Sequence, residues 1–226
     1  MLCQFTVKNF KSIRDEVTFD MQAAAISEHE DRIIIDKDEE KYLPVSAIYG
    51  PNGGGKSNVL AALHTLVAKV LRPLFATEDS EEKVLLQKKI IVEPFVFSES
   101  KDEPTEFELF FRTAVSEYRY ILHVKRELVL YESLDRVKLE TGRKSALFTR
   151  DENGIVLKGA FAKLKVSDEL SKTLTLLSYL GIAYKGNAVV KDVLSWFEYG
   201  IEFLNYGNPI QELRMAVSTS EEVKQL

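Results

Sequence analysis

The spacing of hydrophobic positions changes along the first third of the chain, and each spacing predicts a different element. Partly alternating runs at 2–7 and 16–21 predict two strands, which the turn-like segment KNFKSIRD joins as an antiparallel pair. An apolar stretch at 45–50, VSAIYG, predicts a further strand that leads directly into a glycine-rich segment. Helical spacing then predicts a helix over 56–71, ended by Pro73.

The remaining chain divides into a β-rich part and a helical part. From about 90 to 157, short apolar runs succeed one another with turn signals between them. Connections this short exclude helical crossovers, so the strands are expected to be antiparallel. From Asp168 onward, helical spacing returns. We therefore predict an α/β fold: a P-loop-containing sheet with the 56–71 helix, an antiparallel β-lobe, and the start of a helical subdomain.

The glycine-rich segment carries the clearest chemical signal. Residues 50–57 satisfy the pattern G-x-x-x-x-G-K-[ST] completely, between an apolar strand and an amphipathic helix. Glycines let backbone amides turn inward around phosphate oxygens, and a helix N-terminus adds partial positive charge. Lys56 is expected to reach the β- and γ-phosphates of a nucleotide, and the Ser57 hydroxyl to ligate Mg²⁺. A glycine turn that only starts a helix would not require Lys-Ser at this point.

Composition and charge narrow the function classes. The chain has 226 residues with a net charge of −5, which disfavours a protein that binds nucleic acid over its whole surface. The basic spots at 123–126 and 142–144 are interpreted as solvated hairpin tips. Cys3 is the single cysteine, so no intrachain disulfide forms. With no signal-peptide pattern and no run of eighteen apolar residues, we expect a cytoplasmic protein without membrane association.

The residues around the loop resemble a particular group of ATPases. The segment GPNGGGKSN, with Asn52 inside the loop and Asn58 after the serine, resembles the P-loop of ABC-type ATPases of the SMC, RecF and OLD group. The opening FTVKNFKSIRDEVTFD resembles the first hairpin of the same group. The runs VEPFVF, PTEFELFF, YRYILHV and LVLYESL look like the β-lobe of related bacterial AAA-family ATPases, which often occur in phage-defence or abortive-infection systems. The resemblance covers most of the chain, and its specific motif is the P-loop.

This resemblance implies a set of nucleotide-binding residues. Asn9, Lys11 and Ser12 lie in the first-hairpin turn, which is near the nucleotide in the resembling proteins; for Lys11, a solvated turn lysine is an equal alternative. The implied set is Asn9, Lys11, Ser12, Gly50, Pro51, Asn52, Gly53, Gly54, Gly55, Lys56, Ser57 and Asn58, with Ser57 as the Mg²⁺ ligand and ATP with Mg²⁺ as cofactors.

Two further parts of such an ATPase are not found in the chain. These are a strand ending Asp-Glu and a signature loop of the Leu-Ser-Gly-Gly kind. The isoleucines before Asp36 precede the P-loop, so we interpret them as an ordinary short strand, and Glu93 is kept as a candidate near the nucleotide. His64 and His123 are interpreted as packing or surface histidines. We expect the 226 residues to form one incomplete ATPase domain. Its predicted parts are 1–89 with the hairpin, the P-loop strand and the helix, 90–160 as the β-lobe, and 161–226 as the helical segment.

Two functions follow as hypotheses. The first is an ABC-type ATPase domain that uses Mg-ATP binding or hydrolysis, and an ATP-dependent homodimer, to control a nuclease, toxin or DNA-handling partner. Its competence as an ATP hydrolase is open because the Asp-Glu strand and signature loop are missing. The alternative is a non-catalytic nucleotide-sensing or interaction module. A small-molecule kinase or GTPase is disfavoured because the chain lacks an Asn-Lys-x-Asp motif.

Overall fold

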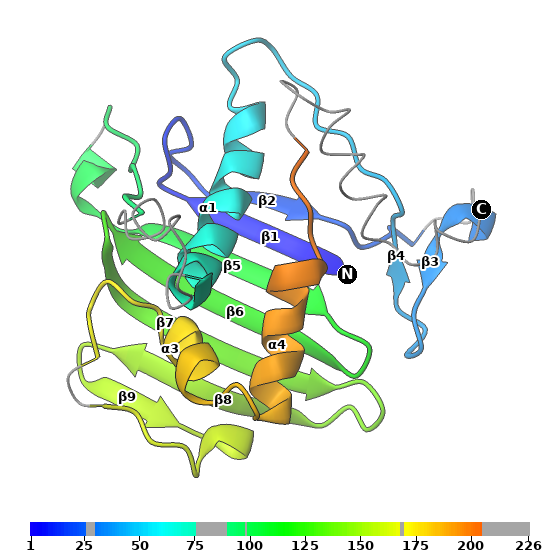
Figure 1. Cartoon of the computed structure of the whole chain (residues 1–226). Helices are drawn as coiled ribbons and strands as arrows, with labels where there is room; N and C mark the ends of the chain where they lie inside the picture. Colours follow the sequence, from blue (N-terminus) through cyan, green and yellow to red (C-terminus); the bar gives the residue numbers. More distant parts are fainter. Residues whose placement is uncertain (26–29, 76–89, 98, 168–169, 205–226) are drawn as a thin grey trace.

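In the part of the chain that the structure describes, seven strands form one antiparallel sheet in the order β2-β1-β5-β6-β7-β8-β9 (Figure 1). The computed structural model describes residues 1–25, 30–75, 90–97, 99–167 and 170–204. The strands of the sheet are β1 (Leu2–Lys8), β2 (Val17–Asp20), β5 (Thr105–Arg112), β6 (Ser116–Lys125), β7 (Leu128–Lys138), β8 (Lys144–Asp151) and β9 (Gly154–Leu157). A smaller sheet pairs β3 (Ile34–Ile35) with β4 (Lys41–Tyr42), and three short 3-10 helices are η1 (Glu30–Arg32), η2 (Glu99–Asp102) and η3 (Gly159–Phe161).

The order of the strands confirms the predicted hairpin and β-rich part. Strand β1 pairs with β2 in register Phe5↔Phe19, and each strand from β5 to β9 pairs antiparallel with the next. Strand β1 also pairs with β5, which places the first hairpin in the same sheet as the β-rich part. The turns at the ends of β6 and β7 contain Arg126 and Gly142, both with positive φ. Arg126 and Arg143 therefore lie at hairpin tips, whereas residues 123–125 belong to β6 and Lys144 begins β8.

Among the described residues, three helices cover one face of this sheet: α1 (Lys56–Phe75), α3 (Leu176–Ala183) and α4 (Ala188–Tyr199) (Figure 1). The Thr175 side chain accepts a hydrogen bond from the Ser178 amide at the start of α3, and Asn187 caps α4 in the same way. By length and composition alone, α1 could cross a membrane. Its apolar residues Leu63 and Leu66 are nevertheless buried against the sheet, as in the core helix of a globular domain.

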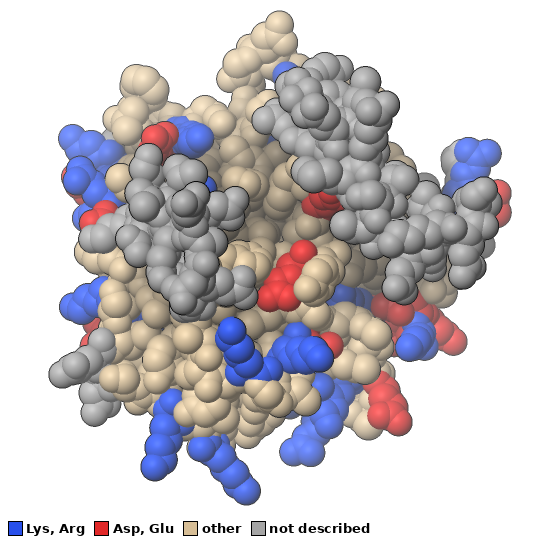
Figure 2. Space-filling view, viewed as in Figure 1, with Lys and Arg blue, Asp and Glu red and all other residues tan. Residues whose placement is uncertain are grey.

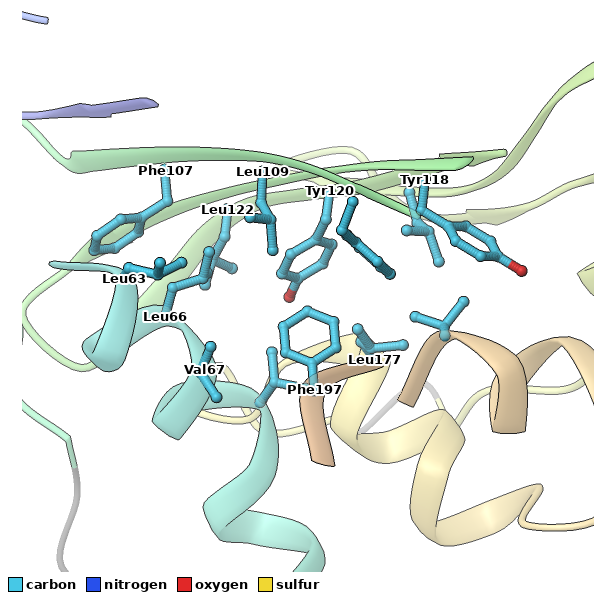
Figure 3. Packing of buried hydrophobic residues seen from close by; sticks show 14 of the residues in the cluster. Leu63, Leu66, Val67, Phe107, Leu109, Tyr118, Tyr120, Leu122, Leu177 and Phe197 are labelled. Atoms are coloured by element: carbon cyan, nitrogen blue, oxygen red, sulfur yellow. The ribbon is translucent and has the colours of Figure 1, made fainter. Parts of the chain in front are cut away.

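Alternation along the strands produces the core between the sheet and the helices. Neighbouring strands bring Phe107 opposite Leu122 and Leu109 opposite Tyr120, and all four side chains are buried. Figure 3 shows these side chains pointing toward those of α1, and Phe197 of α4 pointing toward Tyr120. Fully burying one such side chain stabilises the fold by about 1.5–3 kcal/mol, so this layer is the main source of cohesion. It fixes α1, and with it the loop from which α1 begins.

A buried carboxylate attaches α3 to the sheet. Glu132 of β7 has no solvent exposure, and its two oxygens accept hydrogen bonds from the amides of Leu176 (2.6 Å) and Leu177 (2.9 Å). The Tyr120 hydroxyl donates to the same carboxylate at 2.9 Å, and the Arg150 guanidinium lies 4.0 Å away. Burial raises the pKa of Glu132, while the hydrogen bonds to its charged form and the nearby Arg150 act in the opposite direction. The side chain thus supplies the acceptor that the first amides of α3 need.

The α/β fold class is confirmed, whereas several element boundaries differ from the predictions. The helix expected to end before Pro73 continues to Phe75, because Leu71 and Leu74 pack against the core and hold its last turn. The strand expected at 45–50 is wrong: each residue of this stretch is exposed, and the stretch belongs to none of the described strands. A strand needs a partner for its backbone groups, and no described strand pairs with this one.

Other differences lie in the second half of the chain. Residues 90–97 were expected to belong to the β-rich part, but among them only Val92 forms a bridge, to Arg126. The helical spacing that begins near Leu170 becomes helix only from Leu176. Residues 205–226 of the predicted helical segment lie outside the described residues. The division into 1–89, 90–160 and 161–226 remains a prediction, although the first two parts share one sheet.

Candidate functional site: the phosphate loop and its supporting turn

The loop between the exposed stretch and α1 has the backbone conformation that the glycine pattern requires. Gly53 has φ +81° and Gly55 has φ +86°, in the left-handed region that side chains disfavour. Gly54 lies close to the backbone of Pro51 in the same loop: a Cβ added to Gly54 would be 3.1 Å from the Pro51 carbonyl oxygen. The glycines therefore make a tight turn that leads into the first residue of α1, Lys56.

This turn leaves backbone amides without partners. Within the loop, the Gly54 amide donates to the Pro51 carbonyl at 3.1 Å, and the Asn58 amide donates to Gly55 at 2.8 Å. Among the described residues, no acceptor is found for the amides of Gly53, Gly55, Lys56 and Ser57. Unpaired amides at the start of a twenty-residue helix form a site for an anion, and the helix dipole adds to it.

Lys56 folds back over the loop. Its ammonium group donates to the carbonyl oxygens of Gly50 at 2.8 Å and Pro51 at 2.7 Å. The lysine side chain therefore spans the loop from the first turn of α1 to the residues that precede the glycines. A phosphate in the loop offers this cation a stronger, charged acceptor in place of the two carbonyls.

The residues present fit a nucleotide with a magnesium ion. Ser57 is exposed in the first turn of α1, so its hydroxyl is accessible from the solvent side. Magnesium in such sites keeps several waters and is held by one or two protein oxygens with substrate phosphates. The Ser57 hydroxyl can supply a protein oxygen, while Lys56 and the unpaired amides take phosphate oxygens. The proposed roles of Gly50 to Asn58 remain predictions.

The first-hairpin turn touches this loop directly. The Asn58 side-chain amide donates to the Ser12 hydroxyl oxygen at 2.7 Å. The Ser12 hydroxyl oxygen also lies close to Gly55: a Cβ added to Gly55 would be 3.0 Å from it. The close approach of turn and loop is therefore a second reason for glycine at position 55. Tertiary structure brings together two predicted segments that are more than forty residues apart in sequence.

Asn9 and Lys11 occupy different positions in the same turn. Asn9 is fully buried with φ +56°, and its side chain bonds backbone groups of Phe95, Glu103 and Pro104. Lys11 is exposed, and its backbone amide donates to the Glu93 carbonyl at 2.9 Å. The structure thus places Glu93 beside the turn that contacts the phosphate loop. Nucleotide contacts by Asn9, Lys11 and Ser12 remain predictions.

The remaining candidates are engaged in packing or ion pairs. The Asp36 carboxylate pairs with Arg112 at 3.0 Å, and Arg112 also binds Asp38 and Glu117. Ile34 and Ile35, just before Asp36, form the ordinary short strand that was expected. His64 packs edge-on against Phe203, and His123 contacts Tyr131; burial lowers the pKa of His123. These contacts agree with the interpretation of both histidines as packing residues.

Positive charge is distributed unevenly on the helix-covered face. Figure 2 shows Lys and Arg side chains along its lower part, over the region of α3 and α4 in Figure 1, and also at its upper left. Lys185 and Lys191 line a cavity of about 340 Å³ at the end of α1, whereas the phosphate loop precedes the start of that helix. At the loop itself, the groups that attract a phosphate are Lys56 and the helix amides.

Sequence patterns did not indicate the contact between the turn and the loop, nor the buried network around Glu132. Ser12 and Asn58 were each predicted from resemblance, but no spacing rule pairs them. A buried glutamate in an alternating strand has the sequence pattern of an ordinary surface position. Only the three-dimensional arrangement reveals these two features.

Comparison with known proteins gives one family match. Residues 45–181, more than half of the chain, match the family model described as "AAA domain, putative AbiEii toxin, Type IV TA system". The matched region contains the phosphate loop, α1, all strands from β5 to β9 and most of α3. No curated protein matches the chain.

Proposed function

We propose that this chain, which belongs to the AAA-domain family described as a putative AbiEii toxin of type IV toxin–antitoxin systems, binds Mg-ATP and thereby controls a partner effector. Membership makes it a P-loop ATPase of AAA type related to abortive-infection and toxin systems. The identity of the nucleotide as ATP, the closer likeness to the SMC, RecF and OLD group, and a cytoplasmic location are parts of the proposal. The family match and the loop geometry support nucleotide binding, whereas the likeness to the SMC, RecF and OLD group and the cytoplasmic location rest on the sequence alone.

The observation that carries the proposal is the state of the phosphate loop. Four amides at the start of α1 have no partner among the residues that the structure describes, and Lys56 reaches across the same loop. Buried backbone amides are nearly always paired, and an exposed group of free amides at a helix start is the arrangement that binds phosphate. The same α1 is anchored by buried Leu63, Leu66 and Val70, so the amides are held in place before a ligand arrives.

In the proposed complex, each group of the chain has a distinct task. The amides of Gly53, Gly55 and Lys56 hold phosphate oxygens, and the Lys56 ammonium exchanges its two carbonyl partners for phosphate. The Ser57 hydroxyl contributes one ligand to the magnesium ion, which neutralises phosphate charge when bound. Positioning and charge compensation are thus what these residues supply.

The partner and the assembly are the finer parts of the proposal. The family description names a toxin–antitoxin system, which supports an effector such as a nuclease or toxin as the controlled partner. We further propose that ATP promotes a homodimer, because residues 50–54 of the loop are exposed and accessible to a second protein surface. DNA as a partner is the remaining alternative for the controlled component.

A second candidate function is nucleotide sensing without hydrolysis. The carboxylate that follows the short isoleucine strand, Asp36, is held by the buried Arg112 at 3.0 Å, so it is engaged in an ion pair. An Asp36 carboxylate held in this ion pair is not placed to activate water for hydrolysis. The observation therefore favours nucleotide sensing, with phosphate bound by the described residues and water activated by another polypeptide segment. A comparison of nucleotide affinity with turnover separates the two functions.

Nucleotide titration with and without Mg²⁺ tests the proposal. The wild-type protein is expected to bind ATP, and Lys56→Ala to weaken binding about tenfold or more, because a charge-assisted hydrogen bond contributes about 1.5–3 kcal/mol. Lys191→Ala, an exposed lysine on α4, is the matched control and is expected to bind as the wild type does. A mass measurement with and without ATP tests the homodimer.

The proposal would be overturned by a wild-type protein that binds no ATP, or by Lys56→Ala binding with unchanged affinity. Brisk ATP turnover by the purified chain would exclude the sensing module and favour the ATPase. An unchanged mass at saturating ATP would exclude the homodimer alone.

A further inference from the structure

The turn between β1 and β2 is held rigidly by its own backbone. The Phe10 amide donates to the Ile13 carbonyl at 2.8 Å, and the Ile13 amide donates back to Phe10 at 2.7 Å. Two residues of the turn, Asn9 and Lys11, have positive φ, which costs roughly 1–2 kcal/mol for each side chain. Strain of this kind persists only where surrounding contacts hold it in place.

Asn9 provides those contacts and joins the turn to two other segments. Its side-chain oxygen accepts from the Phe95 amide at 3.0 Å, and its side-chain amide donates to the carbonyls of Glu103 at 3.0 Å and Pro104 at 3.2 Å. Its own carbonyl accepts from the Thr105 hydroxyl at 2.6 Å. A fully buried amide with this set of partners fixes the turn relative to 93–97 and to the start of β5.

The far side of the turn bears on the phosphate loop. Ser12 accepts from the Asn58 side chain at 2.7 Å and lies against the backbone of Gly55, one residue before α1. Between these two ends, the Lys11 amide donates to the Glu93 carbonyl at 2.9 Å. A continuous series of short contacts therefore runs from the loop through residues 9–13 to residues 93–97.

We propose that Ser12 and Asn58 are positioning residues of the nucleotide site, and that their hydrogen bond transmits occupation of the phosphate loop to residues 93–97. The inference rests on the proposed function and adds a route by which nucleotide binding acts on a second segment. Segment 93–97 exposes Val96 and Phe97, which are 59% and 87% accessible, so its position controls an apolar surface beside the site.

The physical basis is the rigidity of the series. A phosphate that replaces the loop carbonyls as the partner of Lys56 restrains the first turn of α1, in which Asn58 lies. Asn58 passes this restraint to Ser12 through their hydrogen bond, and Ser12 also lies against Gly55. Because Asn9 braces the turn, the restraint extends through the turn to the Lys11–Glu93 contact.

A double-mutant cycle on nucleotide affinity is the first test. Ser12→Ala and Asn58→Ala are each expected to raise the Kd for Mg-ATP about fivefold, the loss of one hydrogen bond. The double variant is expected to show the same fivefold change, because each substitution removes the same bond. Ser12→Thr keeps a hydroxyl and is expected to restore affinity. Thr65→Ala removes a hydroxyl from α1 that bonds only within the helix, and is the unchanged control.

Several outcomes of the cycle overturn the inference. If the two effects multiply to about twenty-five-fold, the residues act independently, as direct contacts to nucleotide would. An effect of one substitution without the other, or no effect of either, also overturns it.

Amide hydrogen exchange is the second test, with a readout that a merely structural role would not change. In the wild type, Mg-ATP is expected to slow exchange of the Lys11 and Phe95 amides, and Ser12→Ala is expected to abolish this response while Thr65→Ala keeps it. A wild-type response that is absent, or that survives in Ser12→Ala, overturns the inference.

Exchange without nucleotide separates this inference from the proposed function. Ser12→Ala and Asn58→Ala are expected to speed exchange of the Lys11 amide about fivefold in the free protein, since the turn loses one brace. Unchanged exchange there overturns the positioning role. A wild-type protein that binds no ATP overturns the proposed function, while this arm still decides whether the contact holds the turn.

Discussion

Two helices begin on the same face of the sheet, and they satisfy their first amides in opposite ways. At α3, the amides of Leu176 and Leu177 donate to the buried carboxylate of Glu132. The side chain of the N-cap residue Thr175 accepts a hydrogen bond from the Ser178 amide. At α1, the residue before the helix is Gly55, which has no side chain, and the amides there have no acceptor among the described residues. The start of α3 is completed by the protein's own groups, whereas the start of α1 is left open for a ligand.

The surroundings of the two helix starts differ in the same sense. Glu132 and Tyr120 have no solvent exposure, while Tyr49 and Val45, just before the phosphate loop, are 90% and 77% exposed. A carboxylate in a dry interior attaches a helix firmly but leaves no room for a ligand. The contrast shows that one structural element, a helix N-terminus, serves cohesion or binding according to what stands in front of it.

Removing the carboxylate at α3 is expected to give the largest effect. Glu132→Ala leaves two buried amides and the Tyr120 hydroxyl without their acceptor, so the free energy of unfolding is expected to fall by about 3–5 kcal/mol. Urea titration measures it. Glu132→Gln keeps one acceptor oxygen and is expected to lose less. Equal stability of Glu132→Ala and wild type would show that the carboxylate does not hold α3.

A buried lysine between the two regions is expected to make stability depend on pH. The Lys69 ammonium of α1 donates to the Glu127 carbonyl at 2.7 Å, and burial lowers the pKa of Lys69 to about 8, against which Glu127 and Glu132 act by charge attraction. Because the unfolded chain binds this proton up to about pH 10.4, the folded protein should gain stability as pH rises from 8 toward 10.

Between pH 8 and 10, the free energy of unfolding is expected to rise by up to about 1 kcal/mol per pH unit. Urea titration at several pH values measures this rise. Lys69→Met has a similar shape without the charge and is the matched control, for which the rise should vanish. A wild-type stability that is flat or falls between pH 8 and 10 would contradict the assignment.

At the open helix start, two glycines provide a matched pair. Gly53 and Gly55 have nearly the same positive φ, so alanine strains either position by roughly 1–2 kcal/mol. A Cβ at Gly53 meets nothing within 4 Å, whereas one at Gly55 stands 3.0 Å from the Ser12 oxygen. Gly55→Ala is therefore expected to weaken ATP binding more than Gly53→Ala does, as titration would show. Equal losses would mean that the contact with Ser12 does not shape the loop.

The smallest effect is expected at the exposed stretch before the loop. Tyr49→Ser removes a large side chain that is 90% accessible, so the free energy of unfolding should change by no more than about 0.5 kcal/mol. The comparison is with Phe111→Ala in the core, for which about 3–5 kcal/mol is expected because Phe111 is fully buried. A loss at Tyr49 comparable to that at Phe111 would show that the stretch packs against the protein.

Local sequence determined the elements whose formation depends on near neighbours. Short apolar runs over about 90–157 predicted strands, and the short connections between them predicted an antiparallel arrangement, because a parallel pair needs a long crossover. The pattern at 50–57 predicted the turn and the helix start, because glycine freedom and free helix amides are properties of a few consecutive residues. The fold class followed from these two patterns, whereas the family rested on the resemblance of GPNGGGKSN and the β-lobe runs and was shown by the family match.

Tertiary structure alone decided how the elements serve one another. The apolar stretch 45–50 has the composition of a strand, yet a strand exists only where a partner accepts its hydrogen bonds, and no described strand pairs with it. Asn58 meets Ser12, and Glu132 meets the start of α3, across intervals of 46 and 44 residues that carry no periodic signal. Contacts of this kind depend on how the helices lie on the sheet, and that arrangement is set by packing of the whole core.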